Sequence, residues 1–243
     1  LFMIIAGWTV ILFSILLSFI IGKLLNLNKS TLSTFVMMST FGNTSFLGFP
    51  FITAFLGEEN LKYAVIFDQL ASFLPVSLLS GFILAYGSGK SRGIDIKKII
   101  TFPPFIALIT GFLMVALIKL PDFVLLSFKQ LGMTVIPLAL FSVGMNLKFS
   151  GVFNNLKNVS FVILIKMLLV PVLFLLILKM FISDLNIVWK VALIEISMPP
   201  MVLASILVIN EKLDKNLAVS SVGVGIIISF ITVPFIYYLS QVV

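Results

Sequence analysis

The sequence is dominated by apolar runs, each about long enough to cross a lipid bilayer as a single helix. A hydrocarbon core of roughly 30 Å needs about 20 apolar residues per helix. Eight runs meet this length or nearly do: 1–22, 31–57, 61–87, 103–119, 124–146, 159–181, 186–209 and 216–239. Only 10% of the residues are charged, against about 25% in soluble domains, and the runs lack the short alternating pattern of transmembrane β-strands. The sequence therefore predicts an all-α polytopic membrane protein.

The basic residues predict how the helices are oriented, because cytoplasmic loops of membrane proteins carry an excess of lysine and arginine. Ten basic residues lie in loops on one side: Lys23, Lys29, Lys90, Arg92, Lys97, Lys98, Lys148, Lys157, Lys212 and Lys215. Five lie on the other side: Lys62, Lys119, Lys129, Lys179 and Lys190. This bias places the loop 88–102 in the cytoplasm and both ends of this chain outside the cell membrane. The net charge of +7 thus has a topological meaning, and we expect membrane lipid, not nucleic acid, as a partner.

The chain contains no cysteine and no histidine. Their absence excludes disulfides, thiolate or imidazole metal sites, and the Ser-His-Asp and Cys-His arrangements of nucleophilic catalysis. An intramembrane aspartyl protease needs two facing aspartates, and only Asp68 lies within a predicted span. We therefore expect no enzyme activity, and no residue pattern indicates a cofactor or a metal.

Two sets of three helices share one order, in which the middle helix is interrupted by helix-breaking residues. The first set is 1–22, 31–57 and 61–87, and the second set is 159–181, 186–209 and 216–239. The interruptions are 42–50 and 197–200. The two sets begin five helices apart, so they cross the membrane in opposite directions. Inverted repeats of this kind are typical of secondary transporters, whose binding sites form where interrupted helices meet near the midplane.

Two further helices, 103–119 and 124–146, precede the second set, whereas none precedes the first. The chain also begins at Leu1 inside an apolar run, without a methionine or a flanking charge. From this pattern we expect a natural protein of ten helices in a five-plus-five arrangement, of which this sequence lacks the first two. The alternative is a protein of eight helices.

The two interruptions are the candidate binding site. Unwound backbone inside a bilayer is tolerated only where it is buried in protein or lines a wet cavity. Pro50 and Pro200 suit the first position of a new half-helix, where a missing N–H is no loss. Each half-helix would then point its positive N-terminal end at the midplane, which favours an anion there. Packing kinks without any ligand are the alternative.

Polar side chains accompany the first interruption. Asn43, Thr44 and Ser45 supply amide and hydroxyl groups there, and Met198 and Pro199 lie in the second interruption. Asparagine is costly in lipid unless it finds partners. We therefore expect Asn43 to bind the substrate, to cap the broken helix, or to do both.

Three ionisable residues, Asp68, Lys166 and Glu195, lie well inside predicted spans. Lys166 and Glu195 lie at similar depth on neighbouring helices, and an isolated charge at that depth is costly, so we expect them to form an ion pair. A structural pair is one role for these residues, and proton coupling through Glu195 is the other. Asp68 is two turns from the outer end of its helix, where it is either an interfacial acid or a second proton-coupling group.

Three stretches resemble the auxin efflux carrier family of membrane transporters. Residues 41–50, FGNTSFLGFP, resemble the family's N-T-x-x-x-G-x-P stretch. Residues 137–144, PLALFSVG, match its P-L-A-L-F-x-x-G helix, and residues 195–200, EISMPP, match the Met-Pro-Pro region of the second broken helix. The resemblance covers the whole chain, and the short middle loop is similar to that of the bacterial members.

The resemblance implies the fold of the bile-acid symporters and sodium–proton antiporters, with two crossing broken helices in a mobile transport domain. The transport domain would comprise 1–87 and 159–243, and 103–146 would be part of the scaffold. The crossover residues of the family would be Asn43, Pro50, Pro199 and Pro200. Family members dimerise through the scaffold, so the full-length protein is expected to be a homodimer.

The function implied is that of a secondary active carrier that exports a small organic anion, such as a carboxylate, by alternating access. Two alternatives remain at this point. One is a sodium-coupled organic-anion symporter of the bile-acid type, although the chain lacks an evident cluster of acidic ligands at the crossover. The other is a membrane sensor that does not transport.

Overall fold

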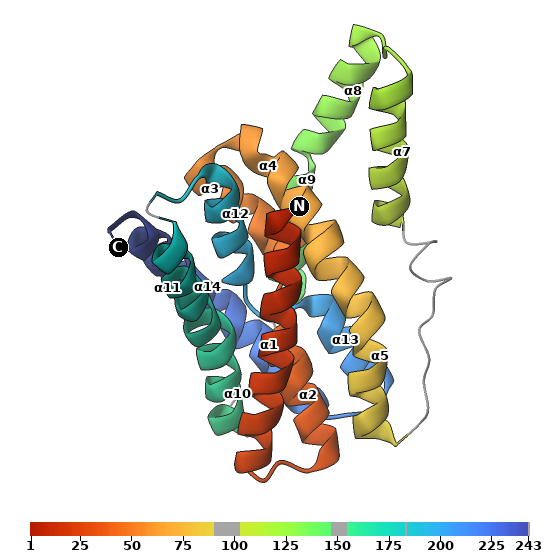
Figure 1. The fold of residues 1–243 in the computed structure, drawn as a ribbon. Coiled ribbons are helices and arrows are strands. Elements are labelled where there is room, and N and C mark those ends of the chain that lie inside the picture. The colour runs from red at the N-terminus through yellow and green to blue at the C-terminus, as the bar shows by residue number, and fades with distance from the viewer. Residues whose placement is uncertain (90–102, 147–154, 183, 243) are drawn as a thin grey trace.

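The structure is a computed structural model that describes residues 1–89, 103–146, 155–182 and 184–242, and these ranges are almost entirely helical (Figure 1). Within these ranges, four helical stretches are long and apolar enough to cross a membrane: Phe2–Leu24, which is α1, then Glu58–Ser88, Leu156–Phe181, and Lys215–Val242, which is α14. The prediction of an all-α polytopic membrane protein is therefore confirmed. Most of the loop expected in the cytoplasm, 88–102, lies outside the described residues.

Two helices are interrupted, as predicted. The helix α2 (Lys29–Thr40) is followed after a break by the π-helical segment η1 (Thr44–Gly48) and by α3 (Phe49–Leu56). The helix α12 (Ile187–Ile196) is followed after a break by α13 (Val202–Asn210). In Figure 1, α2 lies at the bottom of the molecule and α12 lies above it, below α3 and α4.

The interrupted helices form the centre of the fold. Every residue from Leu32 to Thr40 in α2 is buried, and so is every residue from Val191 to Ile196 in α12. A helix that is buried on all faces must be surrounded by other helices. Those surrounding helices, α1 and α14 among them, keep many large apolar side chains exposed, as expected of faces that contact lipid.

Two of the long helices contain a π-helical segment. In the first, η2 (Glu58–Asn60) and α4 (Leu61–Phe67) lead through η3 (Asp68–Phe73) into α5 (Leu74–Ser88). In the second, α10 (Leu156–Ile163) leads through η5 (Leu164–Leu169) into α11 (Val170–Phe181). A proline, Pro75 or Pro171, follows each segment. Proline lacks an N–H and clashes with the carbonyl four residues earlier, so the hydrogen-bond register shifts there, and such π-bulges are frequent at functional sites.

The middle of the chain forms a hairpin that projects from the other helices (Figure 1). Its helices are α7 (Pro103–Leu117) and α8 (Asp122–Met133), and α9 (Val135–Asn146) then packs against η1 and α3. The sequence predicts one span over 124–146, but the structure divides it near Thr134. Pro137 explains the break, because its ring conflicts with the carbonyl of Met133, four residues earlier.

Candidate functional site

The two interruptions meet and pair like a short antiparallel sheet. The backbone N–H of Asn43 donates to the Pro199 carbonyl at 2.8 Å, and that of Met201 donates to the Phe41 carbonyl at 2.9 Å. Each unwound segment therefore satisfies polar groups of the other. This pairing removes much of the cost of burying broken helices, since backbone groups left without partners are expensive away from water.

The two prolines expected to begin half-helices differ in position. Pro50 lies in the first turn of α3, although η1 begins the half-helix earlier, at Thr44. Pro200 lies in the extended part of the second break and faces Gly42, two residues before α13 begins at Val202. The prediction for Pro200 was therefore wrong. Gly42 and Pro200 are a non-hydrogen-bonded pair, in which neither N–H points at the partner, so a residue without an N–H fits there.

Asn43 lies directly before η1, but its side chain makes no capping hydrogen bond to the half-helix. Its backbone carbonyl accepts from the N–H groups of Leu47 and Gly48 at 3.4 and 3.3 Å. The side-chain Nδ2 is buried and has no hydrogen-bond partner. Of the two roles considered for Asn43, capping is thus not the one adopted here, and the amide is left without an internal partner.

The Asp68 carboxylate is held by donors from η1 and η3. Thr44 Oγ1 and Ser45 Oγ each donate to Asp68 Oδ1 at 2.5 Å, and Gln69 Nε2 donates to Oδ2 at 2.7 Å. Thr44 Oγ1 also lies 2.9 Å from Ser72 Oγ. Asp68 is only 3% exposed, so it faces the crossover and not the outer surface. Its three donors are neutral groups.

A cavity of about 560 Å³ opens beside these groups. Its polar lining is Asn43, Thr44, Ser45, Asp68 and Gln69. Its apolar wall includes Phe46 and Phe73 together with Val202, Leu203 and Ile206 of α13. The cavity therefore spans the starts of both second half-helices, η1 and α13. Because α13 begins without a side-chain cap, its first-turn N–H groups are available for a ligand.

Lys166 and Glu195 lie behind the crossover, and the expected direct ion pair between them is not formed. Lys166 Nζ donates to the Ile196 carbonyl at 2.7 Å. Ile196 is the last residue of α12, and a cation is favoured at the negative end of a helix. Neither carboxylate oxygen of Glu195 has a hydrogen-bond partner. Lys166 and Glu195 nevertheless line one small cavity of about 20 Å³, which has room for a single water molecule.

The other candidate residues support the crossover without lining the cavity of about 560 Å³. Met198 is fully buried, and Pro199 and Pro200 form the extended segment that pairs with the first break. Gly225 of α14 packs against this segment, because a Cβ added there would lie 2.7 Å from Pro200 Cδ. The residues that the sequence analysis missed are Gln69 and the start of α13.

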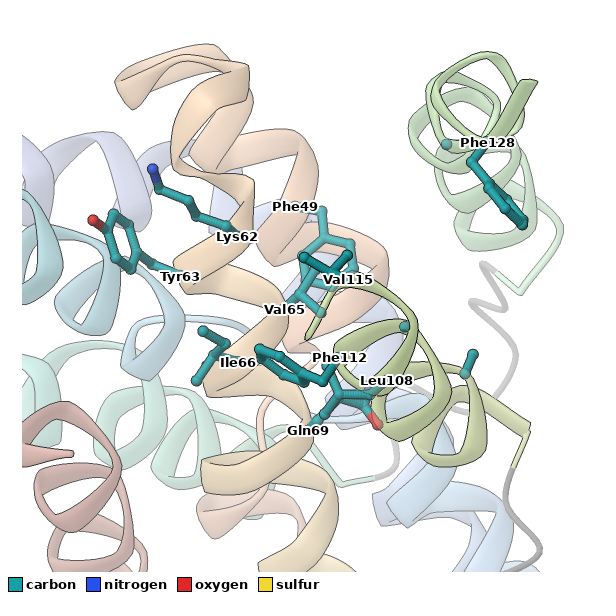
Figure 2. Close-up of a pocket in the computed structure, with 13 residues that line it drawn as sticks. Phe49, Lys62, Tyr63, Val65, Ile66, Gln69, Leu108, Phe112, Val115 and Phe128 are labelled. Carbon is teal, nitrogen blue, oxygen red and sulfur yellow. The ribbon is translucent and has the colours of Figure 1, made fainter. Parts of the chain in front are cut away.

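A second cavity, of about 1010 Å³, lies between α4 and η3 on one side and the hairpin of α7 and α8 on the other. Figure 2 shows Leu108 and Phe112 of α7 next to Ile66 and Gln69. Gln69 and Phe49 line both cavities, so the two cavities adjoin at these side chains. The lining of the second cavity is mainly apolar.

These features define a polytopic helical protein with two crossed, interrupted helices beside a cavity, an arrangement typical of membrane transporters. The sequence matches the family described as membrane transport protein over residues 1–93 and 89–237. The chain belongs to this family, the one that includes the auxin efflux carriers. The family is thus one of membrane transport proteins.

Two archaeal relatives are similar to parts of the chain. An uncharacterized transporter of Methanocaldococcus jannaschii is 32% identical over 145 residues, which cover 56% of this chain and 46% of the relative. An uncharacterized transporter of Methanothermobacter thermautotrophicus is 27% identical over 193 residues, which cover 79% of this chain and 63% of the relative. The chain thus spans about half of the first relative and less than two thirds of the second.

Proposed function

We propose that the protein is a secondary active carrier for a small organic carboxylate, which binds in the 560 Å³ crossover cavity. The observation that carries the proposal is the Asn43 amide, which is buried beside this cavity without a partner. A native structure rarely leaves a buried donor unsatisfied, and such groups call for an explanation. A bound carboxylate would supply the acceptor.

The start of α13 supplies further donors for a carboxylate. Helix N-termini carry a partial positive charge of roughly half a unit and free N–H groups. No Lys or Arg lines the described part of the cavity, so these partial charges replace a formal cation. A site of this kind holds its ligand weakly, which suits a carrier that must release it.

The packing supports the expected division of the chain. The helices of 1–87 and 159–243 pack around the crossover. We propose that these two segments together form the transport domain. The hairpin of α7 and α8 is largely exposed within the chain, and we assign 103–146 to part of the scaffold. Alternating access would then move the crossover relative to this scaffold. Export of the substrate, homodimerisation of the full-length protein, and proton coupling through Asp68 or Glu195 stay predictions.

Binding of carboxylates to the purified chain tests the proposal. Isothermal titration with mono- and dicarboxylates should find at least one ligand, and Asn43→Ala should weaken its binding by about 1–3 kcal/mol, the scale of a hydrogen bond to a charged group. The matched control is Asn216→Ala, since Asn216 is exposed in the first turn of α14. Equal affinity for Asn43→Ala and the unsubstituted chain would place the site elsewhere.

A further inference from the structure

The crossover cavity presents an acceptor as well as a donor. Gln69 Oε1 is buried and has no hydrogen-bond partner, and Gln69 lines the cavity together with Asn43. Gln69 is 6% exposed and Asn43 is 3% exposed. A simple carboxylate can only accept hydrogen bonds, so it could satisfy the Asn43 amide but not the Gln69 oxygen.

The charges around the crossover also indicate that the ligand carries more than a carboxylate. Three ionisable residues are buried there: the acids Asp68 and Glu195 and the base Lys166. The Asp68 carboxylate lines the cavity and is held only by neutral donors, while Lys166 donates to a backbone carbonyl. The described residues therefore supply one positive group for two carboxyl groups. A ligand that carried only negative charge would add a third acidic group to this region, beside Asp68.

We infer that the substrate is a zwitterion, namely an α-amino acid with an apolar side chain. Its carboxylate would bind the first-turn N–H groups of α13 and the Asn43 amide. Its ammonium would bind the Asp68 carboxylate and Gln69 Oε1. The ammonium would thereby supply the positive charge that the described residues lack. This inference rests on the proposed function and narrows its substrate class.

The size and the walls of the cavity support an apolar side chain. The volume of about 560 Å³ lies within the range of about 300–1,000 Å³ that is usual for small-molecule sites. Apart from the polar cluster, the wall includes the rings of Phe46 and Phe73 and the aliphatic side chain of Ile206. The second carboxylate of a dicarboxylate would need a cationic partner, and the described lining contains no cationic side chain.

Three ligands of matched shape test the inference on the purified full chain. L-Leucine carries both charges, 4-methylpentanoate lacks the ammonium group, and 3-methylbutylamine lacks the carboxylate. Titration calorimetry should find leucine bound at least tenfold more tightly than either analogue. The same order is expected for phenylalanine, 3-phenylpropanoate and phenethylamine, which makes the result independent of one side chain.

Asp68→Asn should remove the preference for leucine over 4-methylpentanoate, because it removes the partner of the ammonium group. The control is Asp122→Asn, a matched change at an exposed residue at the start of α8, which should leave the preference intact. Gln69→Met provides a second variant if Asp68→Asn fails to fold. It should weaken the binding of leucine more than that of 4-methylpentanoate.

The possible results separate this inference from the proposed function. If 4-methylpentanoate binds as tightly as leucine, with or without added sodium, the zwitterion inference is overturned and the carboxylate site stands. If the preference for leucine persists in Asp68→Asn, the assigned position of the ammonium is overturned. If only the amines bind, or if no carboxylate-bearing ligand binds, the proposed function fails as well.

Discussion

At the scale of single residues, the crossover contains two kinds of buried polar group with opposite effects on stability. The Asn43 amide has no partner, and an unsatisfied buried donor costs about 1–3 kcal/mol. Lys166, in contrast, has a carbonyl partner and lines the same small cavity as the Glu195 carboxyl group. Removing Asn43 should therefore cost no stability without ligand, whereas removing Lys166 should be expensive.

The first prediction concerns Asn43 in the absence of ligand. Asn43→Ala should be at least as stable to thermal unfolding in detergent as the unsubstituted chain, because the substitution deletes the unpaired donor. Replacement of a capping asparagine would instead lower stability by about 0.5–2 kcal/mol. A clear drop in melting temperature would mean that the amide has a structural partner.

The second prediction concerns Lys166. Lys166→Met should lower the stability by about 1–3 kcal/mol, because it leaves the Ile196 carbonyl without its donor and removes the positive group that lines the same small cavity as Glu195. The double variant Lys166→Met/Glu195→Gln should recover part of the loss. Lys157→Met, at an exposed lysine near the start of α10, is the control and should have little effect. A double-mutant cycle with coupling near zero would show that the two residues do not interact.

At the scale of elements, the crossover depends on close packing between the second break and α14. A Cβ on Gly225 would lie 2.7 Å from Pro200 Cδ and 3.1 Å from Pro199 Cβ, both of which belong to rigid rings. Gly48 of η1 has a similar role, since a Cβ there would collide with the Glu195 carboxylate. Small residues of this kind let helices in membranes approach closely.

The third prediction tests this packing. Gly225→Ala should destabilise the protein by about 1–3 kcal/mol, the usual cost of overpacking a core, because neither proline ring can move away. Gly111→Ala in α7 is the matched control, since no atom lies within 4 Å of the added Cβ. That control should gain up to about 1 kcal/mol from helix propensity. Thermal unfolding that moved in the same direction for both variants would contradict the packing argument.

The sequence predicted the elements better than it predicted their contacts. Long apolar runs located the spans, and Gly42 and Pro200 marked the breaks, because lipid makes unpaired backbone so costly that these signals are strong. The partner of Lys166 was not predictable, since it is a backbone carbonyl at a helix end and such acceptors leave no trace in the sequence. The sequence did not predict that Asp68 lines the cavity. The orientation of Asp68 depends on the π-helical segment η3, for which Pro75 was the only signal.

At the scale of the whole molecule, the ends of the helices form two opposite faces. Asp214, just before α14, accepts a hydrogen bond from Thr31 in α2, which places the links 25–28 and 211–214 on one face. Within or next to these links lie Lys23, Lys29, Lys212 and Lys215. On the opposite face, Tyr237 near the end of α14 stacks on Phe55 of α3 at 4.9 Å between ring centroids. These four lysines, which belong to the set of ten assigned to the cytoplasmic side, thus lie on one face.

The last prediction is the orientation that follows from the ten-to-five distribution of basic residues in the full sequence. Basic residues are retained on the cytoplasmic side during membrane insertion, so the face with Lys23 and Lys212 should lie in the cytoplasm. The chain has no cysteine, so single cysteines can be introduced without background labelling. Asn216→Cys should react with a membrane-impermeant maleimide only after the cells are permeabilised. Glu58→Cys, at an exposed position on the opposite face, should react in intact cells, and the reverse pattern would invert the assigned topology.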